Sequence, residues 1–218
     1  GNSPTDREIQ PLVWAMKSGN IEVVRLLLDH GGDPNGNEEL TPLFMAIEDG
    51  WVEGVRLLLD RGADPNGIGD FDPLSEAAGN ELHRFVTLEE RLEIARLLLR
   101  KGAAPHRAEG EPMRSAILSG DLAMVELLHD AGAPFETVNG LSPLVQATHA
   151  GSSDIVRFLL DRHLAGGEAD IRDALKAYAE ELDSALNYQS RGFDEQKQLA
   201  ALAVIQSLLQ ARLQAGSR

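Results

Sequence analysis

The sequence lacks cysteine and is poor in aromatic residues. Without cysteine the chain has no disulfides, no thiolate ligands for zinc and no cysteine nucleophile, although the redox state of its compartment stays undecided. Aromatic residues make up only 5% of the chain, so Leu, Val, Ile and Ala must fill the core. This composition favours helices packed on helices over a sheet sandwich rich in β-branched and aromatic side chains.

Long apolar runs are also missing. No stretch of 18 or more apolar residues occurs, so we expect no membrane insertion. The first residues show no basic segment followed by an apolar one, as a signal peptide would. We therefore expect a cytoplasmic protein, and a leader removed before Gly1 stays open as an alternative.

Basic residues are scarce relative to acidic ones. The chain has 20 Lys and Arg against 35 Asp and Glu, which gives a net charge of −15. A field of this sign repels phosphate backbones and anionic membrane surfaces, which argues against nucleic acid as a ligand. It attracts a basic partner, although the simpler interpretation is that the acidity only keeps the protein soluble.

The main feature of the sequence is an internal repeat. The segment IEVVRLLLDHGGDPN at residues 21–35 recurs at residues 52–66 as VEGVRLLLDRGADPN, and shorter versions begin at residues 92, 122 and 155. A proline precedes each copy, an alanine follows each proline by four residues, and in four copies a glycine follows by eight. The prolines are Pro11, Pro42, Pro73, Pro112 and Pro143.

Each recurring residue has a physical role in a pair of helices. Thr41, Asp72 and Ser142 stand before a proline, which is typical of a helix N-cap with proline at the first helical position. The alanine allows close packing, and the glycine ends the first helix in a left-handed conformation. The leucine-rich run forms a broad apolar face that only a neighbouring copy can cover.

These residues resemble the ankyrin-repeat family over about residues 8–163. The third copy departs from the pattern, because residues 73–97 span 24 positions where residues 42–57 span 15, and the nine extra residues fall within 80–91. In the fourth copy His129 replaces a leucine and Pro134 an aspartate. The resemblance implies an all-α solenoid of stacked helix-turn-helix units.

The C-terminal part lacks the repeat but keeps helical periodicity. Two apolar stripes predict two amphipathic helices, which would hide the last apolar surface of the solenoid. We expect repeats over residues 5–166 and a capping helix pair over residues 167–216, with a separate domain as the less favoured alternative. The stripes are Ile171, Leu175, Tyr178, Leu182 and Leu186, then Leu199, Leu202, Ile205, Leu209 and Leu213.

No catalytic motif is present. None of the six histidines is paired at metal-ligand spacing, and nucleophile elbows and phosphate-binding loops are missing. We expect no catalytic residue, no cofactor and no metal. The 80–91 insertion, with Glu81, His83 and Glu89, is the only segment in which catalytic residues could lie.

The family resemblance implies a concave surface of loop tips and first helices that holds a partner. The residues predicted to bind are Trp14, Asn37, Glu38, Leu40, Met45, Glu48, Asp49, Ile68, Asp70, Phe71, Glu76, Asn80, Arg107, Leu118, Leu141 and His149. For three of these residues an alternative to partner binding stays open. Trp14 could belong to the edge of the core, and Leu40 and Phe71 could pack on neighbouring loops.

The sequence therefore predicts a non-catalytic module, monomeric alone, that binds a basic partner protein. Two alternatives stay open: a bacterial immunity protein that neutralises a secreted toxin, and a structural or regulatory scaffold subunit. The Asp-Pro-Asn loops and the Ala-, Leu- and Arg-rich composition favour a bacterial source.

Overall fold

The computed structural model describes residues 5–36, 41–79, 86–106, 111–187 and 195–216, which form helices and one isolated β-bridge between Val138 and Leu141. The all-α repeat fold predicted from the sequence is confirmed. The helices are α1 (Thr5–Ser18), α2 (Ile21–Asp29), α3 (Pro42–Glu48), α4 (Val52–Asp60), α5 (Pro73–Ala78), α6 (Leu88–Arg100), α7 (Glu111–Ser119), α8 (Leu122–Asp130), α9 (Pro143–His149), α10 (Ser153–Asp161), α11 (Glu168–Asn187) and α12 (Glu195–Gly216).

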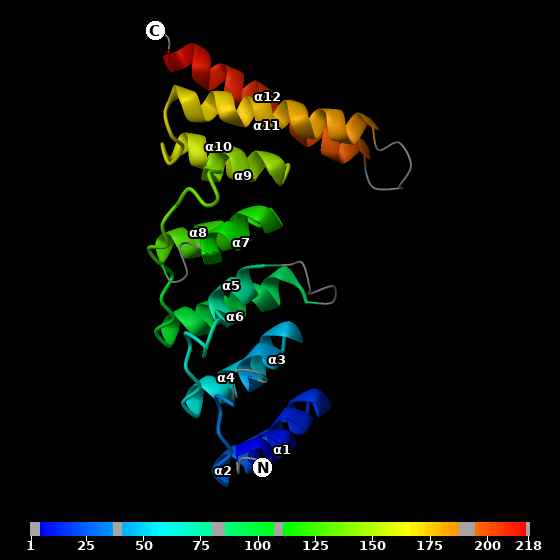
Figure 1. Cartoon of the computed structure of the whole chain (residues 1–218), viewed down its shortest axis with the longest axis vertical. Helices are drawn as coiled ribbons and strands as arrows, with labels where there is room; N and C mark the ends of the chain where they lie inside the picture. The colour runs from blue at the N-terminus through cyan, green and yellow to red at the C-terminus, as the bar shows by residue number, and fades with distance from the viewer. Residues whose placement is uncertain (1–4, 37–40, 80–85, 107–110, 188–194, 217–218) are drawn as a thin grey trace.

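The helices pair in chain order and the pairs stack into an elongated pile (Figure 1). Within the pile, each odd-numbered helix packs on the next odd-numbered one, and each even-numbered helix on the next even-numbered one. The loops that connect successive pairs run along one side of the stack. The chain thus forms two parallel layers, first helices and second helices.

Local capping explains where the first helices begin and end. Thr41 and Ser142 accept hydrogen bonds from the backbone N–H three residues later, at 3.2 Å in both cases, and Asp72 accepts one from Leu74 at 3.1 Å. The predicted glycines end these helices with positive φ: Gly19, Gly50, Gly120 and Gly151 lie between 64° and 72°. Both signals act as the sequence predicts.

The first copy corrects one prediction. Pro11 does not begin its helix but lies inside α1, which starts at Thr5. The upstream residues include good helix formers such as Arg7 and Glu8, so the helix continues past the proline at the cost of one backbone hydrogen bond.

The core is continuous from one helix pair to the next. The alanine four residues after each proline is at most 5% exposed. In the second helices one small apolar residue per copy is completely buried, and these are Val24, Val55, Ala95, Val125 and Val156. Each pair therefore depends on its neighbours for its core.

The third pair contains a buried charge that the sequence did not reveal. α6 begins with a capping box in which Thr87 and Glu90 bond each other's backbone N–H, and these hydrogen bonds from Thr87 lower the pKa of Glu90. Next to it, Arg91 is 4% exposed and donates to the carbonyls of Ala78 at 3.2 Å and Gly79 at 3.1 Å. Arg91 also forms an ion pair with Asp121, and so links the third pair to the fourth.

The C-terminal helices extend the stack. α11 packs on α9 and on α12, and α12 packs on α10. Both helices project beyond the stack in Figure 1. Part of each predicted stripe is buried, namely Ile171, Tyr178, Leu202, Ile205 and Leu209. Among the described residues, none of the helices is long and apolar enough to cross a membrane.

We expect Arg91→Ala to lower the free energy of unfolding by about 3 kcal/mol, because it removes the ion-pair partner of Asp121 and the side-chain donor to the Gly79 carbonyl, while the Ala78 carbonyl keeps only the Ser119 hydroxyl. Arg96 is the control: it lies on the same helix, 41% exposed and 4.0 Å from Glu89, so Arg96→Ala should cost about 0.5 kcal/mol or less. Urea denaturation measures both. Equal losses would show that the buried pair contributes no more than a surface pair.

Candidate protein-binding surface

The structure separates the predicted contact residues by exposure. Trp14, Glu48, Asp49, Asp70, Leu118 and Leu141 are exposed, whereas Ile68, Phe71, Glu76 and His149 are half-buried. Asn37, Glu38, Leu40, Asn80 and Arg107 lie outside the described residues, as do Glu81 and His83 of the insertion.

Met45 does not belong on the surface. Its side chain is 8% exposed and forms part of the core. Gln146, at the same position of the fifth copy, is 2% exposed. The position three residues after the proline is buried in the second and fifth copies and half-buried at Glu76 and Ser115 in the third and fourth. The burial of Met45 corrects the expectation that it contacts a partner.

Phe71 packs within the molecule, on helix α3 of the pair before it. Its ring lies edge-on to that of Phe44, with centroids 5.4 Å apart. Gly67 holds the loop close, since a Cβ there would lie 2.2 Å from the Phe71 carbonyl oxygen, and its φ is 72°. Phe71 supports the loop rather than standing free.

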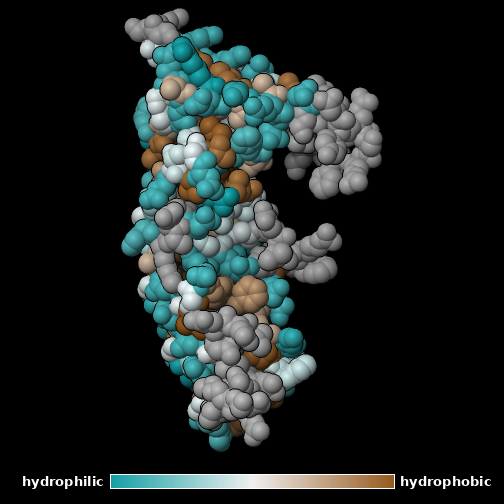
Figure 2. All heavy atoms as spheres, viewed as in Figure 1, coloured by the Kyte–Doolittle hydropathy of each residue, from teal (hydrophilic) through white to brown (hydrophobic). Residues whose placement is uncertain are grey.

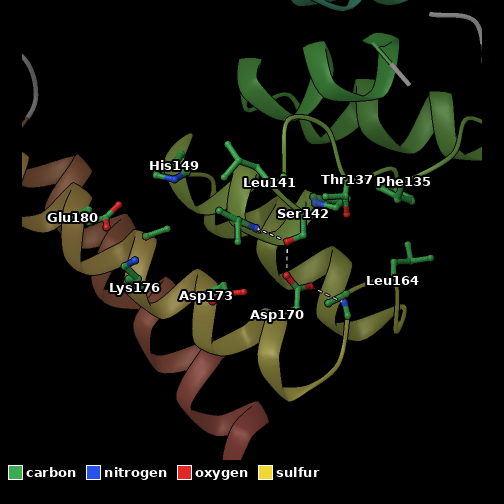
Figure 3. Close-up of a pocket in the computed structure, with 16 residues that line it drawn as sticks. Phe135, Thr137, Leu141, Ser142, His149, Leu164, Asp170, Asp173, Lys176 and Glu180 are labelled. Carbon is green, nitrogen blue, oxygen red and sulfur yellow. Dashed lines mark hydrogen bonds between the residues drawn. The ribbon is translucent and has the colours of Figure 1, made fainter. Parts of the chain in front are cut away.

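A groove of about 660 Å³ lies between the loop from α8 to α9, helix α9, the loop from α10 to α11, and α11 (Figure 3). Two predicted contact residues, Leu141 and His149, line it. Figure 2 shows hydrophobic side chains gathered below α11, in the region of α9 and α10, with further hydrophobic side chains lower on the same face. The groove therefore brings apolar surface and polar side chains together.

An aromatic cluster holds the loop side of the groove. The ring of His129 lies 5.4 Å from that of Phe135 and 5.9 Å from that of Phe158. Phe135 lines the groove from this anchored position. The histidine that replaces a leucine in the fourth copy thus joins the loop to α10.

Hydrogen bonds fix the α11 side. Asp170, in the first turn of α11, accepts bonds from the Ser142 hydroxyl and from the Gly166 N–H, the latter at 2.7 Å. Further along, Nδ1 of His149 lies 2.9 Å from Oε1 of Glu181. The groove is therefore held at both ends, and His149 is engaged with α11 rather than free.

The wall of the groove keeps charges without partners. Asp173, Lys176 and Glu180 extend from α11 along one side of the groove (Figure 3). All three are exposed, and none forms an ion pair within the part of the chain that the structure describes. Together with Asp170 they give the wall a net negative charge.

This arrangement suits binding. In the described part of the chain, no group of three or more His, Asp or Glu side chains is placed to hold a metal ion.

The sequence did not predict Asp170, Asp173 and Glu180 as groove residues, because α11 carries no repeat motif. The sequence feature that could have indicated them is the row of acidic residues on α11 opposite its apolar stripe. This row becomes part of a groove only because α9 packs beside α11.

Comparisons with known proteins agree with the repeat architecture. The family model for ankyrin repeats (3 copies) matches residues 2–68 and 82–174. One segment is similar to the DNA-binding protein RFXANK of Mus musculus, with 53% identity over 34 residues. That segment is 16% of this chain and only 13% of the mouse protein, a length close to one repeat.

We expect Asp170→Ala to destabilise the protein by about 2 kcal/mol, because it removes two hydrogen bonds at a half-buried site. Asp173→Ala, about one turn later on the exposed wall, should change stability by about 0.5 kcal/mol or less. Thermal and urea unfolding of both variants provide the comparison. If Asp170→Ala is as mild as its control, the link between loop and helix does not hold the groove.

Proposed function

Because the chain belongs to the ankyrin-repeat family, whose members are generally non-enzymatic protein-interaction modules, we propose that it binds a basic partner protein. The binding surface consists of the loop tips and first helices of the stack, together with the groove beside α11. The partner contributes a lysine- or arginine-bearing segment that enters the groove. The stack contributes the exposed first-helix residues Glu48, Asp49 and Leu118.

The groove is the observation that carries this proposal. Leu141 is 41% exposed at its mouth, where a folded protein without a partner gains nothing from an apolar side chain. Across from it, Asp173 and Glu180 form no ion pair with any described residue, although Lys176 lies between them on α11. An apolar centre with an acidic rim matches a basic segment that carries an apolar anchor.

The overall charge supports the same partner. A net charge of −15 accelerates encounter with basic proteins and opposes approach to phosphate backbones. The DNA-binding name of the mouse relative does not transfer, since the match covers only 13% of that protein.

The fixed shape of the groove favours affinity. Its two ends are tied by Asp170 and by the His149–Glu181 contact, so binding orders little that is mobile. The exposed acidic pair contributes mainly to attraction and to the choice of partner.

The test begins with affinity capture from the source organism and identification of the partner by mass spectrometry. A secreted toxin would support the immunity role and a subunit of a larger assembly would support the scaffold role. An acidic partner that binds equally well at high salt would contradict the proposal.

With the partner in hand, we expect the double variant Asp173→Lys, Glu180→Lys to bind about tenfold more weakly or worse at low salt. The control is Glu126→Lys with Asp154→Lys, which makes the same charge change at exposed sites on the second helices α8 and α10, away from the groove lining. Isothermal titration calorimetry of the two double variants separates the groove from the general field. Similar losses in both would place the contact elsewhere.

A further inference from the structure

The loop from α8 to α9 makes a tight turn at the mouth of the groove. Val138 and Leu141 exchange two backbone hydrogen bonds, of 3.1 and 3.0 Å. Asn139 and Gly140 form the turn between them, with φ of 53° and 78°. Two successive residues with positive φ are typical of a type I′ hairpin turn, in which an asparagine followed by a glycine is the preferred pair.

An asparagine followed by a glycine can also react with its own backbone. The nitrogen of Gly140, after losing its proton to water, can attack the side-chain carbonyl carbon of Asn139, because glycine has no side chain to block the approach. A new C–N bond forms, the bond to the side-chain amide nitrogen breaks, and ammonia leaves. The resulting succinimide takes up one water and opens at either carbonyl, to aspartate or to isoaspartate. Water is the only reactant required.

The same pair of residues occurs twice more in the chain, as Asn35-Gly36 and as Asn66-Gly67. A small glycine follows the asparagine in all three cases, so the sequence gives the three sites similar reactivity. The structure separates them through the hydrogen bonds and the exposure of each asparagine.

The first two asparagines are bonded to the loop of the following copy. Oδ1 of Asn35 accepts the backbone N–H of Asp64 at 2.7 Å, and Oδ1 of Asn66 accepts that of Ala104 at 2.8 Å. Both asparagines are half-buried. The backbone N–H of Gly67 also donates to the carbonyl of Asp64 at 3.0 Å, so at this site the attacking nitrogen is engaged as well. These bonds must break before either amide can react.

Asn139 is not restrained in this way. Asn139 and Gly140 are both exposed, and within the described chain neither the Asn139 side chain nor the Gly140 N–H forms a hydrogen bond. The turn must still open before the nitrogen can attack. The bridge between Val138 and Leu141 is isolated from any further strand pairing in the described residues, so it can open locally without disturbing the helices.

We propose that Asn139 is a site of spontaneous deamidation, and that the loop-to-loop hydrogen bonds of Asn35 and Asn66 protect the other two sites. The modified residue lies next to Gly140 and Leu141, which line the groove. Aspartate adds a negative charge there, and isoaspartate adds an atom to the backbone, which disrupts the tight turn before Leu141. The effect on capture of a basic segment rests on the proposed function, whereas the reaction at Asn139 does not.

The test is incubation of the full chain for several weeks at neutral pH, below its unfolding temperature, in water enriched in heavy oxygen. Peptide mapping by mass spectrometry then follows each asparagine. We expect the Asn139 peptide to become a mixture of aspartate and isoaspartate that has taken up solvent oxygen. Asn35 and Asn66 should convert about tenfold more slowly, a factor that corresponds to one hydrogen bond. The measurement needs no partner, so its failure would leave the proposed function standing.

The same incubation in concentrated urea is the control for sequence effects. Because the loops are unfolded there, the three asparagines should convert at similar rates. Equal rates in the folded chain, or an Asn139 that stays intact, would overturn the proposal. So would an Asn139 that remains fastest in urea by the same factor, since the difference would then not come from the structure.

A variant that releases Asn66 tests the protection directly. Ala104→Pro removes the N–H that donates to Asn66, and Pro134, at the same position of the fourth copy, shows that the loop accepts proline there. Asn66 should then convert about tenfold faster, with an unchanged helical spectrum. Asn139→Gln is the matched control: it keeps an amide but requires a larger ring, so it should stop the reaction at this turn and leave Asn66 slow. An Asn66 that stays slow in folded Ala104→Pro would overturn the assigned protection.

Discussion

Burial of each helix pair between its two neighbours is the interaction on which the whole structure depends. A pair of short helices cannot enclose an apolar centre, so the leucines and valines of one copy are covered by the next copy. The small alanine in each first helix allows neighbouring pairs to pack closely. The completely buried valine or alanine in each second helix lies at the centre of the core between them. All other features of the molecule are consequences of the stack or exceptions to it.

One exception carries the proposed function. At the C-terminal end, two long helices replace a sixth repeat, and the mismatch between a long helix and a short one leaves the groove beside α11. In the first pair that the structure describes, Trp14, Val23 and Leu26 are exposed.

Local features of the fold could be predicted from the sequence, because each depends on the backbone of a few residues. Thr41 and Ser142 cap their helices and Gly50 turns left-handed whatever the rest of the chain does. The missed features depend on residues brought together from different copies. Arg91 meets Asp121 across 30 positions, and Asp170 meets Ser142 across 28.

One residue of the predicted binding surface, Met45, is buried for the same reason. Met45 and Trp14 share one repeat position, and the sequence alone cannot show that a neighbour covers the first and not the second. His149 was predicted as a contact residue, but α11 engages it through Glu181. Leu141 lines the groove with its side chain 41% exposed, whereas Phe71, at the same position of the third copy, is half-buried against Phe44.

Native-state hydrogen exchange along the chain tests the stacking account most directly. The account predicts low protection in α2, which has a neighbour on one side only, and high protection from α4 through α10, because α11 and α12 cover the last repeat. If α10 exchanged as fast as α2, the C-terminal helices would not complete the stack. The groove would then have no fixed wall, and the account would be wrong.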